Sequence, residues 1–281
     1  MLYKTLITAQ DLAQNLHRPD WVLFDCRFSL SDSQYGSRQY RRGHLPTARY
    51  ADLNEDLSAP LTSNTGRHPL PDFRVLAQKL GAWGVNEYSQ VVVYDDQAGA
   101  FAGRLWWLLR CMGLESVAVL DGGMQSWQNA GYGLTTHLPR PQAVTFRTYL
   151  NTPSWLNALQ VENGIASKTW RLIDARSPER YSGKHEPIDR VAGHIPSACN
   201  RPFSHNLVQG LFRPAAQLRS EFAALMGAYR PEQVVHYCGS GVSACHNVLA
   251  MEYAGLHGSK LYAGAWSEWL VNKNRAIVSR G

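Results

Sequence analysis

The chain has 281 residues, of which 44% are hydrophobic and 18% charged, and its formal net charge is +6. This length suits one large domain or two ordinary ones, and the composition is that of a globular protein. No apolar run approaches the ~18 residues that cross a bilayer, and the N-terminus, MLYKTLITAQDLAQNL, has no signal-peptide pattern. We therefore expect a cytoplasmic protein with no membrane partner.

The basic residues are scattered, with no run longer than Arg41-Arg42, which favours a solvated basic surface over nucleic-acid binding. The cysteines number five and include no C-x-x-C pair, so we expect neither a disulfide framework nor a zinc site. No P-loop and no G-x-G-x-x-G opening a helix is present, so the sequence indicates no cofactor.

The N-terminal half reads as strands alternating with helices. Its first two blocks are WVLFDCR (21–27) and RRGHLPTA (41–48), and the second is a turn set by glycine and proline. QVVVYDD (90–96) is a buried strand, AGAFAGRLWWLLRCMG (98–113) a helix and SVAVLDGG (116–123) the next strand. This alternation predicts an α/β domain, with a parallel sheet and helices on its faces.

The C-terminal half repeats these blocks in the same order. The repeats are RLIDARS (171–177), VAGHIPSA (191–198), VVHYCG (234–239) and YAGAWSEW (262–269). Four blocks at near-equal spacing predict two copies of one domain. His44 and His194 lie in the same turn of both copies, so we expect both to have a structural role.

A polar segment with three prolines, GLTTHLPRPQAVTFRTYLNTP (133–153), separates the copies and reads as a linker. We predict a first domain at 1–135, a linker at 136–153 and a second domain at 154–281.

One cysteine is set apart by its surroundings. Cys238 follows a buried strand, so it lies at the carboxyl end of a parallel strand, where open α/β sheets bind ligands. The loop GSGVS then enters a helix predicted to begin near Ala244. Converging N–H groups and the helix N-terminus favour the thiolate and lower its pKa, and the hydroxyls of Ser240 and Ser243 can donate to the sulfur. We predict a catalytic thiolate that needs no metal. The loop residues predicted to stabilise it are Gly239, Ser240, Gly241, Val242, Ser243 and Ala244.

The first copy carries Asp95 where the second carries Cys238. A carboxylate is no sulfur nucleophile, so we expect the first domain to be catalytically inactive. Tyrosine phosphatases also place a cysteine in an anion-binding loop, with the pattern C-x5-R. Here Ala244 takes the place of that arginine, which disfavours a phosphatase because the guanidinium is the main clamp on phosphate.

These blocks resemble the two-domain rhodanese-like sulfurtransferases over nearly the whole chain. CGSGVS (238–243) is similar to the family loop CGSGVT, and DAR (174–176), GHIP (193–196) and GAWSEW (264–269) also match. The resemblance implies two tandem rhodanese-like domains, of which the first carries aspartate at the cysteine position. It also implies that Cys238 becomes a persulfide, taking sulfur from a small anionic donor, thiosulfate or 3-mercaptopyruvate. The acceptor would be cyanide or a thiol, with a thioredoxin-like reductant as a further candidate.

The resemblance also implies residues that bind the donor. Arg180, in SPERYSG, matches the family arginine that faces the active cysteine. The mercaptopyruvate branch has a second arginine in an E-P-R segment. Here Ile188 takes that position and the nearest arginine is Arg190. Arg176 is a further candidate, although its equivalent in the first copy, Arg27, favours a structural role.

The segment TGRHPLP (65–71) resembles one that reaches the other domain's site in the family, and His68 is its candidate, with Arg67 beside it. Thiosulfate-preferring members carry arginine and lysine straight after the cysteine, whereas Gly239 and Ser240 fit the mercaptopyruvate pattern. We therefore expect a moderate preference for 3-mercaptopyruvate. The alternative is a non-catalytic sulfur-binding or regulatory module, which predicts an unreactive Cys238.

Overall fold

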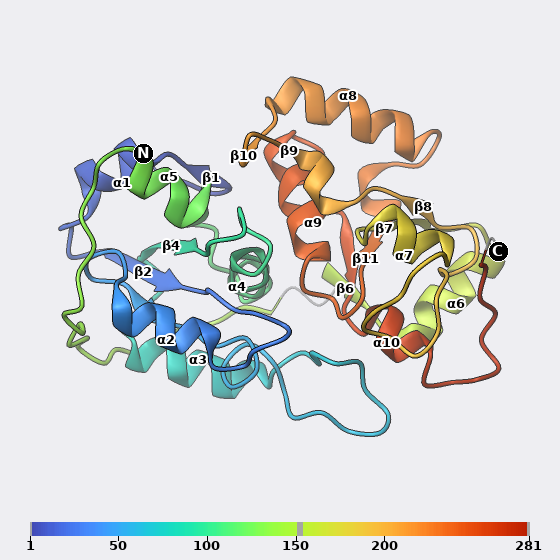
Figure 1. Cartoon of the computed structure of the whole chain (residues 1–281), viewed down its shortest axis with the longest axis horizontal. Helices are drawn as coiled ribbons and strands as arrows, with labels where there is room; N and C mark the ends of the chain where they lie inside the picture. The colour runs from blue at the N-terminus through green and yellow to red at the C-terminus, as the bar shows by residue number, and fades with distance from the viewer. Residues whose placement is uncertain (1, 151–153, 280–281) are drawn as a thin grey trace. The chain divides into compact units, whose positions relative to one another are not determined.

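The computed structural model describes residues 2–150 and 154–279 (Figure 1). By its internal contacts the chain forms two compact units. The first comprises Met1–Ala59 and Leu70–Asn151, and the second comprises Pro60–Pro69 and Thr152–Gly281. The short segment at 60–69 therefore groups with the C-terminal part of the chain.

The predicted linker at 136–153 ends on residues 151–153, which lie outside the described residues. Its described part packs along the first unit. The N–H of Val144 donates to the carbonyl of Gly81 at 2.9 Å, and the N–H of Tyr149 donates to the carbonyl of Met112 at 3.0 Å.

The first unit is a five-stranded parallel sheet in the order β1-β5-β4-β2-β3, with helices around it (Figure 1). The strands are β1 Leu6–Ile7, β2 Trp21–Asp25, β3 Arg49–Tyr50, β4 Gln90–Tyr94 and β5 Val117–Leu120. The helices are α1 Ala9–Asn15, α2 Tyr35–Arg42, α3 Phe73–Ala82, α4 Ala102–Cys111 and α5 Gly123–Asn129. The strands and the helix expected at 90–123 are confirmed.

The second unit repeats this sheet in the order β6-β12-β11-β7-β8, again parallel (Figure 1). Its strands are β6 Trp155–Leu156, β7 Arg171–Asp174, β8 Cys199–Asn200, β11 Val234–Tyr237 and β12 Lys260–Tyr262, and a hairpin is formed by β9 Leu207–Val208 and β10 Leu211–Phe212. Its helices are α6 Ala158–Ala166, α7 Pro178–Ser182, α8 Ala215–Met226, α9 Ala244–Tyr253 and α10 Ala265–Trp269, with 3-10 turns η2 Phe203–Asn206 and η3 Pro231–Gln233. The two matching sheets confirm the predicted α/β fold in two copies.

Because side chains alternate along a strand, β11 faces two different layers. Val235 and Tyr237 join the core cluster that holds α6 and α10. His236 points to the other layer, where its ring meets Phe222 of α8 edge-on and its Nε2 lies 3.1 Å from the Met251 sulfur of α9. The strand is therefore buried on both faces, as central parallel strands are. No helix within 2–150 and 154–279 is long and apolar enough to cross a membrane.

An aspartate-arginine pair closes the same turn in each unit. Arg27 pairs with Asp25 at 2.6 Å and donates to the carbonyl of Gly43 at 2.7 Å. Arg176 pairs with Asp174 at 2.6 Å and donates to the carbonyl of Gly193 at 2.6 Å. Both guanidinium groups are buried. The pair thus ties the end of one strand to the glycine-proline turn.

The histidines of these turns are structural in both units, as expected. His44 stacks on Tyr40 with ring centroids 3.9 Å apart, and His194 stacks on Tyr181 at 3.8 Å. In each case Nδ1 lies within hydrogen-bonding distance of that tyrosine's carbonyl, at 2.7 and 2.8 Å. Each ring is therefore committed to its local turn.

The burial of His236 makes an acid-dependent contribution to stability. Burial lowers its pKa from 6.5 to about 3, with the nearby Arg201 acting in the same direction. The folded protein therefore binds fewer protons than the unfolded chain between pH 6.5 and about 3. The stabilisation is fully present above pH 6.5 and is lost as the pH falls through this window, by up to ~1.4 kcal/mol per pH unit.

We expect His236→Leu to flatten the pH dependence of the free energy of unfolding between pH 6.5 and 4. Its stability at pH 7 should change little, because Nδ1 of His236 is buried without a hydrogen-bond partner among the described residues and leucine removes that polar atom. Denaturant titrations across the window measure this. An unchanged slope in the variant would assign the acid sensitivity to other groups.

Candidate active site

Cys238 directly follows β11, the central strand of the second unit, and its side chain is 2% exposed. The next residues form a tight loop, and α9 begins at Ala244, where the sequence predicted it. The carbonyl of Cys238 accepts from the N–H of Trp266, at 3.0 Å, and that of Gly239 accepts from Ser267, at 2.9 Å. The start of α10 therefore fixes the base of the loop.

The loop curls its backbone toward the sulfur. The N–H of Gly241 donates to Sγ of Cys238 at 3.2 Å, and Gly241 has a φ of +77°. Sγ of Cys245 donates to the carbonyl of the same glycine at 3.4 Å. Cys245 therefore contacts the same peptide group that meets Sγ of Cys238, and it is itself buried.

Further N–H groups at the helix start are unused. Among the described residues, the N–H groups of Ser243 and Ala244 have no acceptor. The hydroxyls behave differently from expectation. Oγ of Ser240 lies 2.7 Å from Nδ1 of His68, and within the described chain the N–H of Gly241 alone donates to Sγ of Cys238. A backbone group rather than a hydroxyl therefore meets the sulfur.

In the corresponding loop of the first unit, backbone N–H groups surround a carboxylate. Asp95 is fully buried, and its two carboxylate oxygens accept four backbone hydrogen bonds of 2.8–2.9 Å. The donors are Gln97, Gly99, Phe101 and Ala102, the last at the start of α4. The carboxylate of Asp95 therefore fills this loop, and its second oxygen occupies the position that another anionic atom could take.

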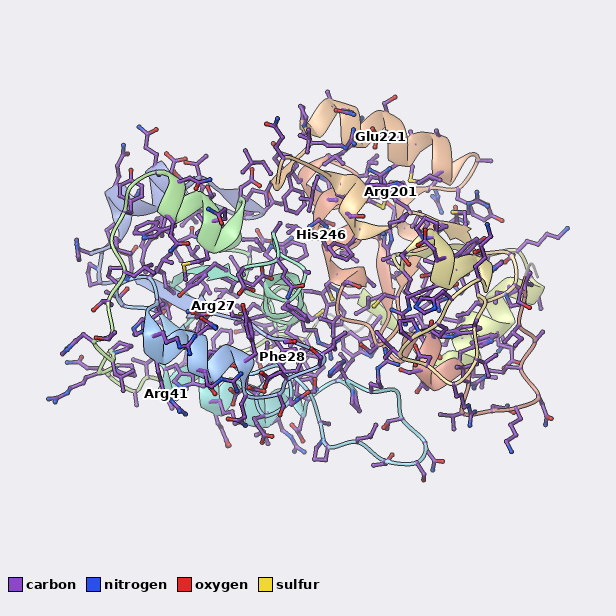
Figure 2. All side chains as sticks on the ribbon, viewed as in Figure 1. Arg27, Phe28, Arg41, Arg201, Glu221 and His246 are labelled. Carbon is purple, nitrogen blue, oxygen red and sulfur yellow. The ribbon has the colours of Figure 1, made fainter. Side chains whose placement is uncertain are left out.

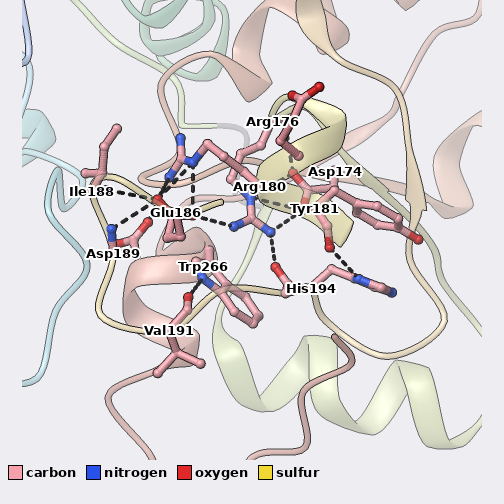
Figure 3. A network of polar contacts seen from close by, with 12 residues as sticks. Asp174, Arg176, Arg180, Tyr181, Glu186, Ile188, Asp189, Val191, His194 and Trp266 are labelled. Carbon is pink, nitrogen blue, oxygen red and sulfur yellow. Dashed lines mark hydrogen bonds and ion pairs between the residues drawn. The ribbon is translucent and has the colours of Figure 1, made fainter. Parts of the chain in front are cut away.

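Two arginines, two carboxylates and a bend of the chain form a network beside the loop (Figure 3). Nε of Arg180, on α7, donates to both oxygens of Glu186, at 3.0 and 2.9 Å, and Nη2 pairs with Asp189 at 3.0 Å. Glu186 also accepts the N–H groups of Ile188 and Asp189 at 3.1 Å and pairs with Arg176 at 3.2 Å. The network shapes the segment that follows α7 and holds Arg180 in one orientation.

A further arginine was not assigned a role by the sequence. Arg67, in the segment 60–69, forms an ion pair with Asp189 and donates its backbone N–H to Oγ of Ser267 at 3.1 Å. A methyl group on Gly239 would lie 2.7 Å from Nη2 of Arg67 and 3.1 Å from Nη2 of Arg180. Both guanidinium groups therefore approach the loop at the residue after Cys238.

The two remaining candidate arginines differ in exposure, since Arg176 is buried and Arg190 is exposed. Arg176 is 3% exposed and is committed to Asp174, Glu186 and a carbonyl, with its guanidinium 4.8 Å from the Trp266 ring. This geometry favours the structural role. Arg190 is exposed and lines a pocket of about 350 Å³ that Arg67 also lines. Among the described residues, no hydrogen bond or ion pair joins the side chain of Arg190 to the network.

Helix α9, whose start carries the loop, is anchored by a polar cluster that includes Arg201, Glu221 and His246 (Figure 2). Arg201 pairs with Glu221 of α8 at 2.7 Å and donates to the side chain of Asn206 at 2.8 Å. Asn206 in turn donates to Asn247 of α9 at 2.7 Å and lies 3.1 Å from Nδ1 of His246. These contacts fix the helix, and with it the position of the loop.

No cluster of three or more His, Cys, Asp or Glu side chains placed to hold a metal ion is found within 2–150 and 154–279.

Comparison with known proteins agrees with this geometry. A family model described as "Rhodanese-like domain" matches residues 8–130 and 152–272. A Pseudomonas aeruginosa protein, provisionally named a 3-mercaptopyruvate sulfurtransferase, is 45% identical over 98% of both chains. A Mycobacterium tuberculosis protein, provisionally named a thiosulfate sulfurtransferase, is 36% identical over 98% of this chain and 96% of its own. The structure of a 3-mercaptopyruvate sulfurtransferase from Leishmania major is similar with a TM-score of 0.82 at 30% identity, covering 95% of this chain and 74% of that one.

Proposed function

Because the chain belongs to the rhodanese-like family and is a sulfurtransferase, we propose that Cys238 carries sulfane sulfur from a small anionic donor to cyanide or a thiol. The observation that carries this proposal is the position of Sγ at the carboxyl end of β11, with the N–H of Gly241 directed at it. A thioredoxin-like reductant is a candidate physiological acceptor. The five cysteines are free thiols, which supports the cytoplasm as the compartment.

The proposed reaction has two transfers. In the first, the thiolate of Cys238 attacks the sulfur that is transferred, so that a new S–S bond forms while the C–S bond of 3-mercaptopyruvate or the S–S bond of thiosulfate breaks. The electron pair leaves with pyruvate enolate or with sulfite, and the enolate takes up a proton. In the second, cyanide attacks the outer sulfur, thiocyanate leaves and the thiolate returns. Covalent catalysis thus divides one transfer into two easier ones.

The loop amides are proposed to stabilise the persulfide. The helix start comes six positions after Cys238 and seven after Asp95, so the two loops differ by one residue. Matched from their helices, the four amides that hold Asp95 correspond to those of Gly239, Gly241, Ser243 and Ala244. Among the described residues, the amides of Ser243 and Ala244 have no acceptor. The outer sulfur of a persulfide on Cys238 would accept hydrogen bonds from these N–H groups, as the second carboxylate oxygen of Asp95 does in the first unit.

His68 is proposed as a positioning residue. It is 5% exposed, and its Nδ1 lies 2.7 Å from the hydroxyl of Ser240. Because the hydroxyl is part of the loop, this contact fixes the side chain of Ser240 and limits the motion of the backbone around Cys238. Arg176 is proposed as structural, and Arg190 as an exposed cation that attracts anions to the pocket it lines.

We propose 3-mercaptopyruvate as the preferred donor, with thiosulfate as the second. Gly239 and Ser240 bring no cation of their own to the loop, and the relative that is 45% identical carries a 3-mercaptopyruvate name. Steady-state rates with each donor at one cyanide concentration test this. A clear preference for thiosulfate would contradict the donor assignment. Binding of sulfur without turnover would instead favour the non-catalytic module.

We expect Arg180→Ala to lower kcat/KM for 3-mercaptopyruvate about tenfold to a hundredfold. Arg180 is held beside the loop by Glu186 and Asp189, and a charge-assisted pair contributes roughly 1.5–3 kcal/mol. Lys184→Ala is the matched control, because Lys184 is an exposed cation four residues along the chain. Equal losses in the two variants would mean that Arg180 acts only through the general charge of the surface.

A further inference from the structure

The first unit has a pocket of its own at the carboxyl ends of its strands. In the order β1-β5-β4-β2-β3, the chain leaves β2 toward β3 and leaves β4 toward β5 on the other side, so its direction reverses between β2 and β4. Open α/β sheets bind ligands at such a point. Arg27, labelled in Figure 2, comes just after β2 and Asp96 just after β4, and both line the pocket.

The lining of this pocket combines charged and apolar groups. Its volume is about 290 Å³, at the lower end of the range of ligand-binding pockets. Besides Arg27 and Asp96, the lining includes the exposed cation Arg42 and the apolar side chains of Met124 and Leu134. The pocket therefore suits a small molecule that has both polar groups and a short apolar chain.

Arg27 has a hydrogen-bond donor that its partners do not use. Its Nε and Nη2 are committed to Asp25 and to the carbonyl of Gly43, whereas Nη1 makes no hydrogen bond among the described residues. In the second unit the same atom has a partner, because Nη1 of Arg176 pairs with Glu186 at 3.2 Å. Arg27 is 5% exposed, so its free donor is suited to a carboxylate oxygen from a ligand.

Asp96 offers an acceptor to the same pocket. Its Oδ2 accepts from the hydroxyl of Tyr35 at 2.6 Å, but its Oδ1 is buried without a partner in the part of the chain that the structure describes. A buried carboxylate oxygen that lacks a donor costs free energy, and an N–H group of a ligand would remove that cost.

We propose that this pocket binds a small zwitterion, with its carboxylate on Nη1 of Arg27 and its ammonium group on Oδ1 of Asp96. The ligand class is an α-amino acid with a short aliphatic side chain, which would pack against Met124 and Leu134. Asp25 neutralises Arg27, and Arg42 balances Asp96, so a ligand without net charge matches the pocket. All the lining residues belong to the first unit, and the inference does not depend on the reaction at Cys238.

The test is isothermal titration calorimetry of the native protein at pH 7 with three molecules of matched shape. L-Norvaline carries both charged groups on a propyl chain, pentanoate lacks the ammonium group and butylamine lacks the carboxylate. We expect norvaline to bind with a Kd of about 1 mM or lower. Each of the other two should bind at least ~10-fold more weakly, because one charge-assisted hydrogen bond is lost.

Asp96→Asn tests the ammonium end of the site. The amide keeps an oxygen for the hydroxyl of Tyr35 but has no charge, so the affinity for norvaline should fall about tenfold while that for pentanoate does not fall. Glu55→Gln is the matched control, since it removes an exposed carboxylate from the same unit, and it should leave the norvaline Kd within about twofold.

Arg27→Lys tests the carboxylate end, because lysine keeps the charge but not the fork of donors. We expect weaker binding of norvaline and pentanoate and unchanged binding of butylamine. Its melting temperature is measured alongside, since Arg27 also ties the turn at Gly43. If this variant does not fold, Asp96→Asn and the three ligands still decide the question.

Several outcomes would overturn the proposal. They are equal affinities of the native protein for norvaline and pentanoate, native-like norvaline binding in Asp96→Asn, and no saturable binding of norvaline up to about 50 mM. The last result would mean that water alone satisfies Arg27 and Asp96. Loss of norvaline binding in Arg180→Ala would also overturn it, because Arg180 belongs to the second unit.

Discussion

Replacing Cys238 with serine should abolish sulfur transfer, by at least ~1,000-fold in the rate of thiocyanate formation. The loop amides that meet Sγ would remain, but the serine hydroxyl is not ionised at neutral pH and cannot carry sulfane sulfur. Native protein treated with donor should gain roughly 32 Da, one sulfur atom, on the peptide that contains Cys238. The serine variant should gain none.

Cys245→Ser is the matched control for this experiment. Cys245 is buried and donates to the carbonyl of Gly241, and a serine hydroxyl can make the same bond. We therefore expect this variant to keep most of its activity and to take up sulfur as the native protein does. Full activity in the Cys238 variant, or sulfur uptake that requires Cys245, would end the assignment of Cys238 as the nucleophile.

The fold and the position of Cys238 at the end of a strand could be predicted because their signals are local. The valine run of β4 and its counterpart in β11 read as buried strands without any tertiary information. The start of α9 at Ala244 followed from the small residues before it. The same blocks occur twice, so each copy supported the interpretation of the other, and the structural contacts of His44 and His194 are the same in both.

The surroundings of Cys238 could not be predicted in the same way. Arg67 and Asp189 are 122 positions apart, and no periodicity or spacing relates residues that meet only through the tertiary fold. The hydroxyl of Ser240 was expected to serve the sulfur, but it pairs with His68, from a segment that groups with the second unit. When a side chain has two available hydrogen-bond partners, the tertiary geometry decides which one it uses, and the sequence does not contain that geometry.

The neutral loop sequence does not mean that the site lacks nearby cations. Gly239 carries no charge, but its missing side chain is what allows the two guanidinium groups to approach. A cationic side chain within the loop and one from another segment would occupy the same space. The loop sequence therefore indicates which segment supplies the positive charge, and not whether a positive charge is present.

The second large effect is expected at Gly241. Its φ of +77° lies in the left-handed region, and a methyl group there would overlap the carbonyl oxygen of Ala263. Strain of this kind costs roughly 2–4 kcal/mol, so Gly241→Ala should lower the melting temperature by roughly 5–10 °C. Relief of the strain also moves the N–H that meets Sγ of Cys238. We expect kcat/KM to fall by at least ~100-fold, the usual cost of one misplaced anion-stabilising donor.

Gly239→Ala separates this backbone effect from the loss of the cations. The φ of Gly239 is outside the left-handed region, and the atoms nearest to an added methyl group are the ends of two flexible arginine side chains. The melting temperature of Gly239→Ala should therefore stay within about 2 °C of the native value, while its KM for an anionic donor rises. Thermal unfolding and steady-state kinetics on the two variants distinguish these outcomes. A Gly241→Ala protein with native stability and native kcat would mean that the loop tolerates another backbone conformation, and that the N–H of Gly241 does not stabilise the reacting sulfur.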